Sequence, residues 1–380
     1  MKNLKTILVL AFAWISASVT AQTDRLFTSN DKLPNSHINS VYQDRQGYVW
    51  ICTEDDLCVF NGLDFNTYYN IQGDSASLEN NHVIQVLEDS HGNFWVGTMM
   101  GLQRYHRETD RFSSFKLQYD YIKEFRFIKA IFEDKKGNIW LSTSGPGVVR
   151  LKAETLTPMF YMRTNSNICS DNINTIFEDR FGNIWIGSQD NGLSVMNLDN
   201  HSIITYNHDP KNEHSLSSNQ ISIIYETPDG TVLIGTLDGG IDSFDHYTKT
   251  FKRNYIPAIH LVFTMMSDSN NNLWVGTDGQ GIKRYNPVTK QLTTYESNLL
   301  NLDFQKLKAH SFFEDKQGNI WVALFQKGVL MIPPGQKLFS NIGFNPFNRN
   351  KNIGTECVLS IVEDHNRQLW TEPTATASTG

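Results

Sequence analysis

Short stretches of alternating apolar and polar residues recur along most of the chain, separated by turn-forming residues. Residues 173–177 (Ile-Asn-Thr-Ile-Phe) alternate with a period of two, and a second apolar stretch at 184–187 follows a Gly-Asn pair. A third stretch lies at 193–197 and a fourth at 202–206. A period of two is typical of β-strands, and Gly-Asn indicates a tight turn. The pattern therefore predicts units of four short antiparallel strands.

This unit repeats along the chain. The segment Glu178–Gly187 (EDRFGNIWIG) returns at 88–97, at 133–141 and at 314–322. One position in the unit is tryptophan in almost every copy, with successive spacings of 45, 45, 45, 48, 41, 47 and 49 residues. The residues at this position, called here the repeat tryptophan position, are Trp50, Trp95, Trp140, Trp185, Leu233, Trp274, Trp321 and Trp370.

Four strands in a repeat of this length are the sequence sign of a β-propeller blade. We therefore predict an all-β fold, a seven-bladed β-propeller of four-stranded antiparallel blades, followed by an incomplete eighth repeat around Trp370. The repeat tryptophans are expected to pack between neighbouring blades. Ring closure needs a strand shared between the chain ends, and residues 25–28 (Arg-Leu-Phe-Thr) or 337–340 (Lys-Leu-Phe-Ser) are the candidates.

The N-terminus has the pattern of a secretory signal. Lys2 and Lys5 precede an apolar stretch from Ile7 to Val19, and small residues follow up to Ala21. The stretch is shorter than the roughly 20 residues that a spanning helix needs. We predict a signal peptide over 1–21, a propeller over 22–344 and the start of a second propeller over 345–380, in an exported, periplasmic protein with no membrane span.

Charge and cysteine content narrow the function classes. The 33 Lys and Arg against 40 Asp and Glu give a net charge of −7, so no positive excess favours nucleic-acid binding. No Cys/His spacing resembles a zinc site, and no cofactor is expected. Cys52 and Cys58 lie symmetrically about a predicted hairpin turn, which leaves two alternatives open: a disulfide, or two small buried thiols.

The run Ile-x-x-Ile-Phe-Glu-Asp-x-x-Gly-Asn-Ile-Trp-Ile-Gly-Thr resembles the two-component regulator propeller repeat, and the likeness covers residues 24–370. That repeat forms the periplasmic sensor region of hybrid two-component histidine kinases in Bacteroidetes-type bacteria, many of which sense oligosaccharides. The resemblance implies a ligand-binding sensor propeller, with an oligosaccharide or other small molecule and a second propeller as partners. The chain contains no kinase phospho-acceptor helix and no ATP-binding glycine motif, so it would lack kinase activity by itself.

Ligand contacts are expected where the loops between blades meet the axial channel, because a propeller scaffold fixes these loops without constraining their sequence. Positions seven and eight residues before the repeat Asp reach this channel mouth. The predicted ligand-binding residues there are His37, His82, Arg126, Phe127, Asn172, Gln220, His260 and Lys308. Neighbouring loops add Tyr121, Asp190, Asp278 and Phe325.

Aromatic rings that stack on sugars, next to carboxylates and amides, are compatible with a glycan ligand. A water-filled channel with solvated strand ends is the alternative interpretation of the same residues. A secreted lyase-like or glycosidase-like enzyme is another, with His37, His82 and His260 converging, and a protein-interaction propeller is a third.

The last residues break the repeat. After Trp370 the pattern calls for Gly-Thr-Asp-Gly-x-Gly-Ile, but residues 372–380 read Glu-Pro-Thr-Ala-Thr-Ala-Ser-Thr-Gly. If the reading frame is shifted by one nucleotide, so that it begins with a preceding guanine, the codons of these nine residues can encode Gly-Thr-Asp-Gly-Asp-Gly-Ile-Asn-Arg. That sequence is close to residues 276–284. We therefore interpret the tail as a frameshift that interrupts a larger sensor kinase, the alternative being an unrelated tail.

Overall fold

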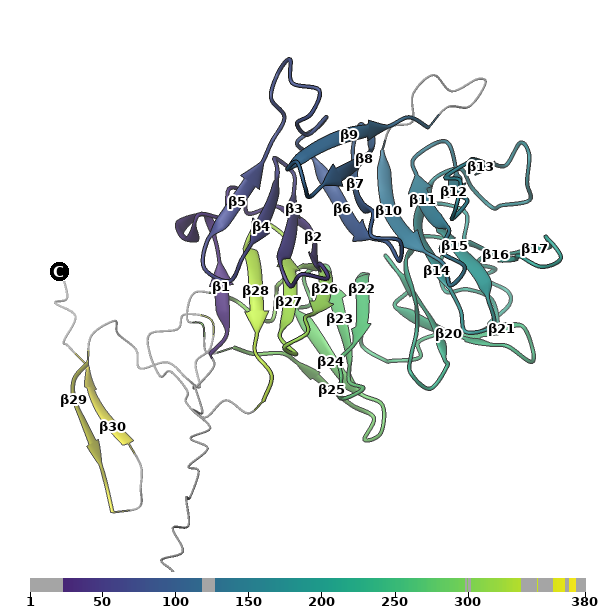
Figure 1. The fold of residues 1–380 in the computed structure, drawn as a ribbon. Coiled ribbons are helices and arrows are strands. Elements are labelled where there is room, and N and C mark those ends of the chain that lie inside the picture. Colours follow the sequence, from purple (N-terminus) through teal and green to yellow (C-terminus); the bar gives the residue numbers. More distant parts are fainter. Residues whose placement is uncertain are drawn as a thin grey trace, which may run out of the picture.

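A computed structural model describes residues 23–117, 127–297, 299, 302–335, 347, 358–365 and 369–373. Seven four-stranded antiparallel sheets follow one another around a central axis (Figure 1). Neighbouring innermost strands contact each other all the way round, including β26 with β2, so the ring is closed. The predicted all-β, seven-bladed propeller is confirmed. Among the described residues, no helix is long and apolar enough to cross a membrane.

The strands take the same place in every blade. The innermost strands are β2 (Ile38–Gln43), β6 (Val83–Glu88), β10 (Ile128–Glu133), β14 (Ile173–Glu178), β18 (Ile221–Glu226), β22 (Val262–Ser267) and β26 (Ala309–Glu314). The second strands are β3 (Val49–Thr53), β7 (Phe94–Thr98), β11 (Ile139–Thr143), β15 (Asn183–Ser188), β19 (Val232–Thr236), β23 (Leu273–Thr277) and β27 (Ile320–Leu324). The third strands are β4 (Leu57–Phe60), β8 (Gly101–His106), β12 (Val148–Leu151), β16 (Leu193–Asn197), β20 (Ile241–Asp245), β24 (Ile282–Asn286) and β28 (Gly328–Ile332). The outermost strands are β5 (Phe65–Tyr68), β9 (Arg111–Phe115), β13 (Pro158–Tyr161), β17 (Ile203–Tyr206), β21 (Thr250–Lys252), β25 (Gln291–Thr294) and β1 (Arg25–Phe27).

Ring closure uses the N-terminal strand. β1 pairs antiparallel with β28, with Leu26 opposite Leu330, and so completes blade 7 beside β28 (Figure 1). A single 3₁₀ turn, η1 (Ser29–Asp31), follows it. Phe27 is buried and stacks on Trp321 with ring centroids 5.6 Å apart. Of the two predicted closing segments, residues 25–28 therefore take the edge of β28, and 337–340 lie outside the described residues.

A buried aspartate holds the turn between the first two strands of six blades. In blade 4, Asp179 accepts N–H bonds from the backbone and side chain of Asn183 and from the indole of Trp185. The indole bonds are 2.8 or 2.9 Å long in all six blades. The pairs are Trp50–Asp44, Trp95–Asp89, Trp140–Asp134, Trp185–Asp179, Trp274–Asp268 and Trp321–Asp315.

The residue before this aspartate links one blade to the previous one. The Glu88 carboxylate of blade 2 accepts the backbone N–H of Arg45, which follows the repeat Asp of blade 1, at 2.8 Å. Six of the seven junctions carry this bond. The donor and acceptor residues are Arg45–Glu88, Ser90–Glu133, Lys135–Glu178, Arg180–Glu226, Ser269–Glu314 and Lys316–Gln43.

The second strands are buried almost throughout, because each is covered by blades on both sides. The ring of the repeat tryptophan lies against the following blade: Trp185 clusters with Ile221, Ile224 and Phe244 of blade 5. The expected packing of these rings between blades is confirmed in all six complete blades that carry tryptophan.

Of the two alternatives for Cys52 and Cys58, the disulfide is wrong. Cys52 lies opposite Leu57 and Cys58 opposite Ile51, so the two side chains point to opposite faces of blade 1. Cys52 packs towards blade 2 and Cys58 towards blade 7, and both thiols are free and buried. Burial raises the pKa of Cys52 to about 12 and also raises the pKa of Cys58. The alternative, two small buried thiols, holds.

An eighth hairpin follows the ring in sequence. β29 (Val358–Glu363) pairs with β30 (Leu369–Pro373), and Val362 lies opposite Trp370. Its register shifts between Val358 and Ser360, where β2 shifts between Ile38 and Ser40. The hairpin thus repeats the first half of a blade, and its strand continues to Pro373. The predicted signal peptide and the tail beyond Pro373 lie outside the described residues.

Replacing Trp185 with Ala tests the interblade packing. The indole is 1% exposed and lies edge-on to Phe244 at 4.9 Å, so the variant leaves a cavity and removes one of the N–H bonds to Asp179. We expect the free energy of unfolding to fall by about 3 to 5 kcal/mol in denaturant titration. A loss below about 1 kcal/mol, as for an ordinary surface substitution, would contradict the packing.

Candidate functional site

The residues at the start of the innermost strands form one ring around the channel mouth. In each blade the carbonyl of this residue accepts a backbone N–H from the loop between the second and third strands, as Glu54 donates to His37 at 3.2 Å. The loop before each innermost strand and the loop between the second and third strands are thereby held on the same rim. The rim residues defined in this way are His37, His82, Phe127, Asn172, Gln220, Leu261 and Lys308.

Blades 1, 6 and 7 bring a group of side chains together on this rim. His37 Nδ1 lies 2.7 Å from the Glu54 carboxylate, and its ring stacks on Phe325 with centroids 5.2 Å apart. His310 approaches Phe325 at 5.1 Å. The rim cluster, as it is called below, consists of His37, Glu54, Phe263, Asp278, Lys308, His310 and Phe325.

An ion pair completes the rim cluster. Lys308 Nζ lies 2.6 Å from Asp278 Oδ1 and 5.6 Å from the centre of the Phe325 ring. Phe263 packs against His310 at 4.7 Å. The side chains of Lys308 and Asp278 are 44% and 33% exposed, so these charged groups can reach a ligand in the solvent. Phe325 is half-buried.

The rim cluster changes the protonation of its inner histidine. Burial lowers the pKa of His310, and the electrostatic effects of Lys308 and His37 act in the same direction. The carboxylates of Asp278 and Glu54 oppose the shift. His310 is therefore neutral at pH 7, with one ring nitrogen as donor and the other as acceptor.

A second polar group lies on blades 3 and 4. Lys129 Nζ donates to Asn174 Oδ1 at 2.8 Å and to Gln189 Oε1 at 2.9 Å. Burial lowers the pKa of Lys129, and Asp190 opposes the shift. Asp190 accepts the Ser170 hydroxyl at 2.6 Å. Asp190 thus belongs to a different part of the rim from Asp278.

The structure assembles four of the twelve predicted binding residues in the rim cluster, namely His37, Lys308, Asp278 and Phe325. Besides Asp190, placed above, the remaining described ones are located by backbone bonds at other points of the rim. They are His82, Phe127, Asn172, Gln220 and His260. Arg126 and Tyr121 lie outside the described residues.

Sequence reasoning missed His310 and Phe263. Both lie two positions after a rim residue, with a buried residue, Ala309 or Val262, between them. The register of the innermost strand shifts at each of these two residues, so the alternation of the strand did not locate their side chains. Within the described residues, no group of three or more His, Cys, Asp or Glu is arranged to hold a metal ion.

The lowered pKa of His310 predicts a pH dependence. The unfolded chain binds this proton more readily than the folded one, so stability is highest above the ordinary value of 6.5 and falls as the pH drops from 6.5 towards the folded pKa. An NMR titration should give His310 a pKa below 6.5. The variant His310→Asn should remove the contribution of this residue to the change of unfolding free energy with pH. A measured pKa at or above 6.5 would contradict the burial.

Comparison with solved structures identifies the same architecture in other proteins. The extracellular domain of a hybrid two-component system of B. thetaiotaomicron has a TM-score of 0.71 at 23% identity over 92% of this chain and 52% of that one. Virginiamycin B lyase from Staphylococcus aureus has a TM-score of 0.60 at 13% identity, over 82% of this chain and 99% of that one. At these identities the likeness shows the fold alone.

Sequence comparison gives the family. A curated relative, histidine kinase P4 of Formosa agariphila, is 27% identical over 363 residues, which span 68% of this chain and 26% of the relative. The chain therefore spans about a quarter of the curated relative. The family model described as two component regulator propeller matches residues 32–55, 77–100, 125–145, 167–190 and 258–279. These segments cover the first two strands of blades 1, 2, 3, 4 and 6, so the chain carries the repeat of the two-component regulator propeller family.

Proposed function

We propose that this propeller is the ligand-sensing module of an extracytoplasmic two-component sensor and that the rim cluster binds an oligosaccharide. The observation that carries the proposal is the meeting of Phe325, His37 and His310 with two carboxylates and a lysine at the channel mouth. The similar solved structure is the extracellular domain of a hybrid two-component system, which supports a location outside the cytoplasm.

The chemistry of the cluster suits a sugar. The ring of Phe325 offers an apolar face for stacking, and the groups around it offer donors and acceptors to hydroxyls. Glu54 and Asp278 are acceptors, Lys308 is a donor, and neutral His310 is both. Two carboxylates against one lysine give the cluster no positive excess, which favours a neutral glycan over a phosphorylated or sulfated one.

Transmission of the signal would need further parts of a longer protein. β29 and β30 repeat the register of the first two strands of a blade, and we infer that they begin a second propeller. The kinase activity of the curated relative belongs to that protein, of which this chain spans about a quarter. Sequencing the downstream DNA tests the inference: a second propeller in a neighbouring reading frame supports it, and its absence there overturns it.

Binding to the rim cluster can be measured on the full chain. A glycan array should identify an oligosaccharide, and calorimetry should then show that Phe325→Ala weakens its binding at least about tenfold, because the stacking surface is lost. Tyr247→Ala is the matched control, since Tyr247 is an aromatic residue, 99% exposed, in the loop between the third and fourth strands of blade 5.

Equal losses in the two variants, or none in Phe325→Ala, would overturn the assignment of the site. The same samples should be analysed for cleaved sugar. Release of product would show that the protein is a lyase-like or glycosidase-like enzyme and not a sensor. The His37–Glu54 pair at 2.7 Å would then be its acid/base group.

A further inference from the structure

The junction between blades 5 and 6 departs from the other six. Leu233 stands at the repeat tryptophan position, and Thr227 replaces the aspartate that would accept its indole N–H. Pro228 replaces the residue whose backbone N–H bonds to the next blade, and Ser267 replaces the glutamate that would accept it. All four replacements fall at one place. The repeat indole and the bond from a backbone N–H to the carboxylate of the next blade are therefore both missing at this junction.

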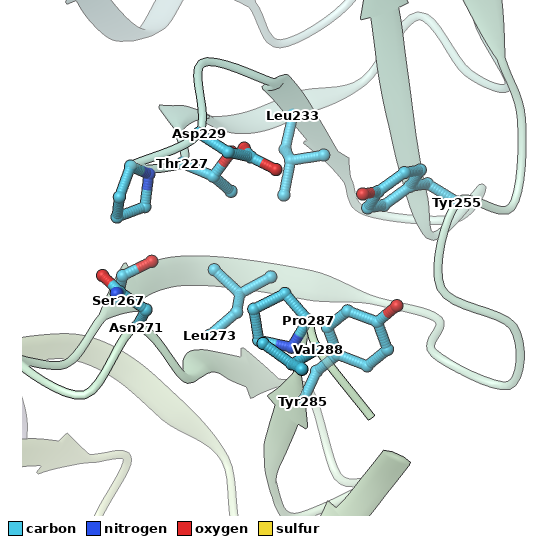
Figure 2. A pocket seen from close by; sticks show the side chains of 11 residues that line it. Thr227, Asp229, Leu233, Tyr255, Ser267, Asn271, Leu273, Tyr285, Pro287 and Val288 are labelled. Atoms are coloured by element: carbon cyan, nitrogen blue, oxygen red, sulfur yellow. The ribbon is translucent and has the colours of Figure 1, made fainter. Parts of the chain in front are cut away.

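These replacements leave a cavity of about 270 Å³ between the two blades, called here the junction cavity (Figure 2). Leu233 of blade 5 and Leu273 of blade 6 face each other across it, and Thr227, Asp229 and Ser267 lie towards one end (Figure 2). A cavity of about 150 Å³ with apolar walls is enough to bind benzene. The junction cavity is therefore large enough for an aromatic ring system.

The walls of the junction cavity are those that hold an indole elsewhere in the ring. Tyr285 lies opposite Leu273 in register, as Tyr105 lies opposite Phe94. In blade 1, Trp50 contacts Phe94 at 4.5 Å and Tyr105 at 5.2 Å. The cavity thus keeps this wall of the next blade, while the indole itself is absent.

The outer wall of the junction cavity also matches the equivalent place in another blade. The backbone N–H of Tyr255 donates to the carbonyl of Ile241, just as the backbone N–H of Tyr295 donates to the carbonyl of Ile282 in blade 6. Tyr295 packs on Trp274 with centroids 5.3 Å apart. Tyr255 therefore stands where the outer aromatic residue covers the tryptophan in other blades, and it lines the cavity together with Tyr285 (Figure 2).

The polar end of the cavity supplies an acceptor. Thr227 donates its hydroxyl to the Asp229 carboxylate, and Thr231 N–H also bonds to that carboxylate, at 3.2 Å. These bonds, together with the positive charge of Arg180, lower the pKa of Asp229. A carboxylate at this end favours a ligand with an N–H or O–H donor and disfavours an anion.

We propose that the junction cavity binds a small free aromatic molecule that carries an N–H or O–H donor, with an indole as the type of ligand. Its ring would occupy the space that a tryptophan fills in six other blades, between Tyr255, Tyr285 and Leu273. The site lies at the end of the strands away from the rim cluster, beside the turns that follow β18 and β22. It is therefore independent of the proposed oligosaccharide site.

Calorimetry and thermal unfolding of the full chain with indole test the proposal. Indole should bind and raise the Tm of the wild type, and Leu233→Trp, which fills the cavity from within, should abolish both effects. The variant pair Thr227→Asp with Leu233→Trp rebuilds the repeat and guards against misfolding: it should unfold at or above the wild-type Tm and also fail to bind. Phe325→Ala, at the rim cluster, should bind indole as the wild type does.

Different probes test the hydrogen-bond donor, the location of the site and the class of ligand separately. Blocking the donor in 1-methylindole should weaken binding about tenfold. Absence of indole binding to the wild type, or equal binding to Leu233→Trp, would overturn the site. If N-acetyltryptophanamide binds more tightly than indole, the cavity takes a protein side chain, and the free small molecule is the wrong ligand.

Discussion

One buried carboxylate in each of six blades carries the bonds on which the ring depends. In blade 3, Asp134 is 3% exposed and accepts N–H bonds from Lys136, from Asn138 and from the indole of Trp140. A buried carboxylate is tolerated only when its oxygens are well bonded. The same residue thus orders the turn, sets the orientation of the ring and directs it towards the next blade. Because the turn and the interblade packing share one group, the six blades that carry it have the same geometry while other positions vary.

This constraint also explains where function can evolve. The bonds lie at one end of the strands, and the rim residues lie at the other, so rim side chains change without loosening the blades. The rim cluster occupies three blades, and its members come from different loops and strands. At the junction of blades 5 and 6, where Leu233 and Thr227 replace the tryptophan and aspartate, the constraint is absent and a cavity is found in its place.

The repeat made the fold predictable, because spacing and strand period identify blades without any tertiary information. The same information did not settle Cys52 and Cys58: symmetry about a turn suggested pairing, but register places Cys52 opposite Leu57, so the two thiols point to opposite faces. Rim positions could be counted back from the repeat Asp, yet which of them meet depends on side-chain packing across blades. His310 was missed for that reason, since its role follows from contacts with Phe325 and Phe263 rather than from its own position.

The coupling between a repeat aspartate and its tryptophan tests the central claim most directly. A double-mutant cycle with Asp134→Asn and Trp140→Phe removes the carboxylate and the indole N–H separately and together, and denaturant titration gives the free energy of unfolding of each variant. The account predicts a coupling of about 1 to 3 kcal/mol, as for a buried hydrogen bond to a charged group. Additive effects, with a coupling of about 0.3 kcal/mol or less, would show that the two groups act independently and would contradict it.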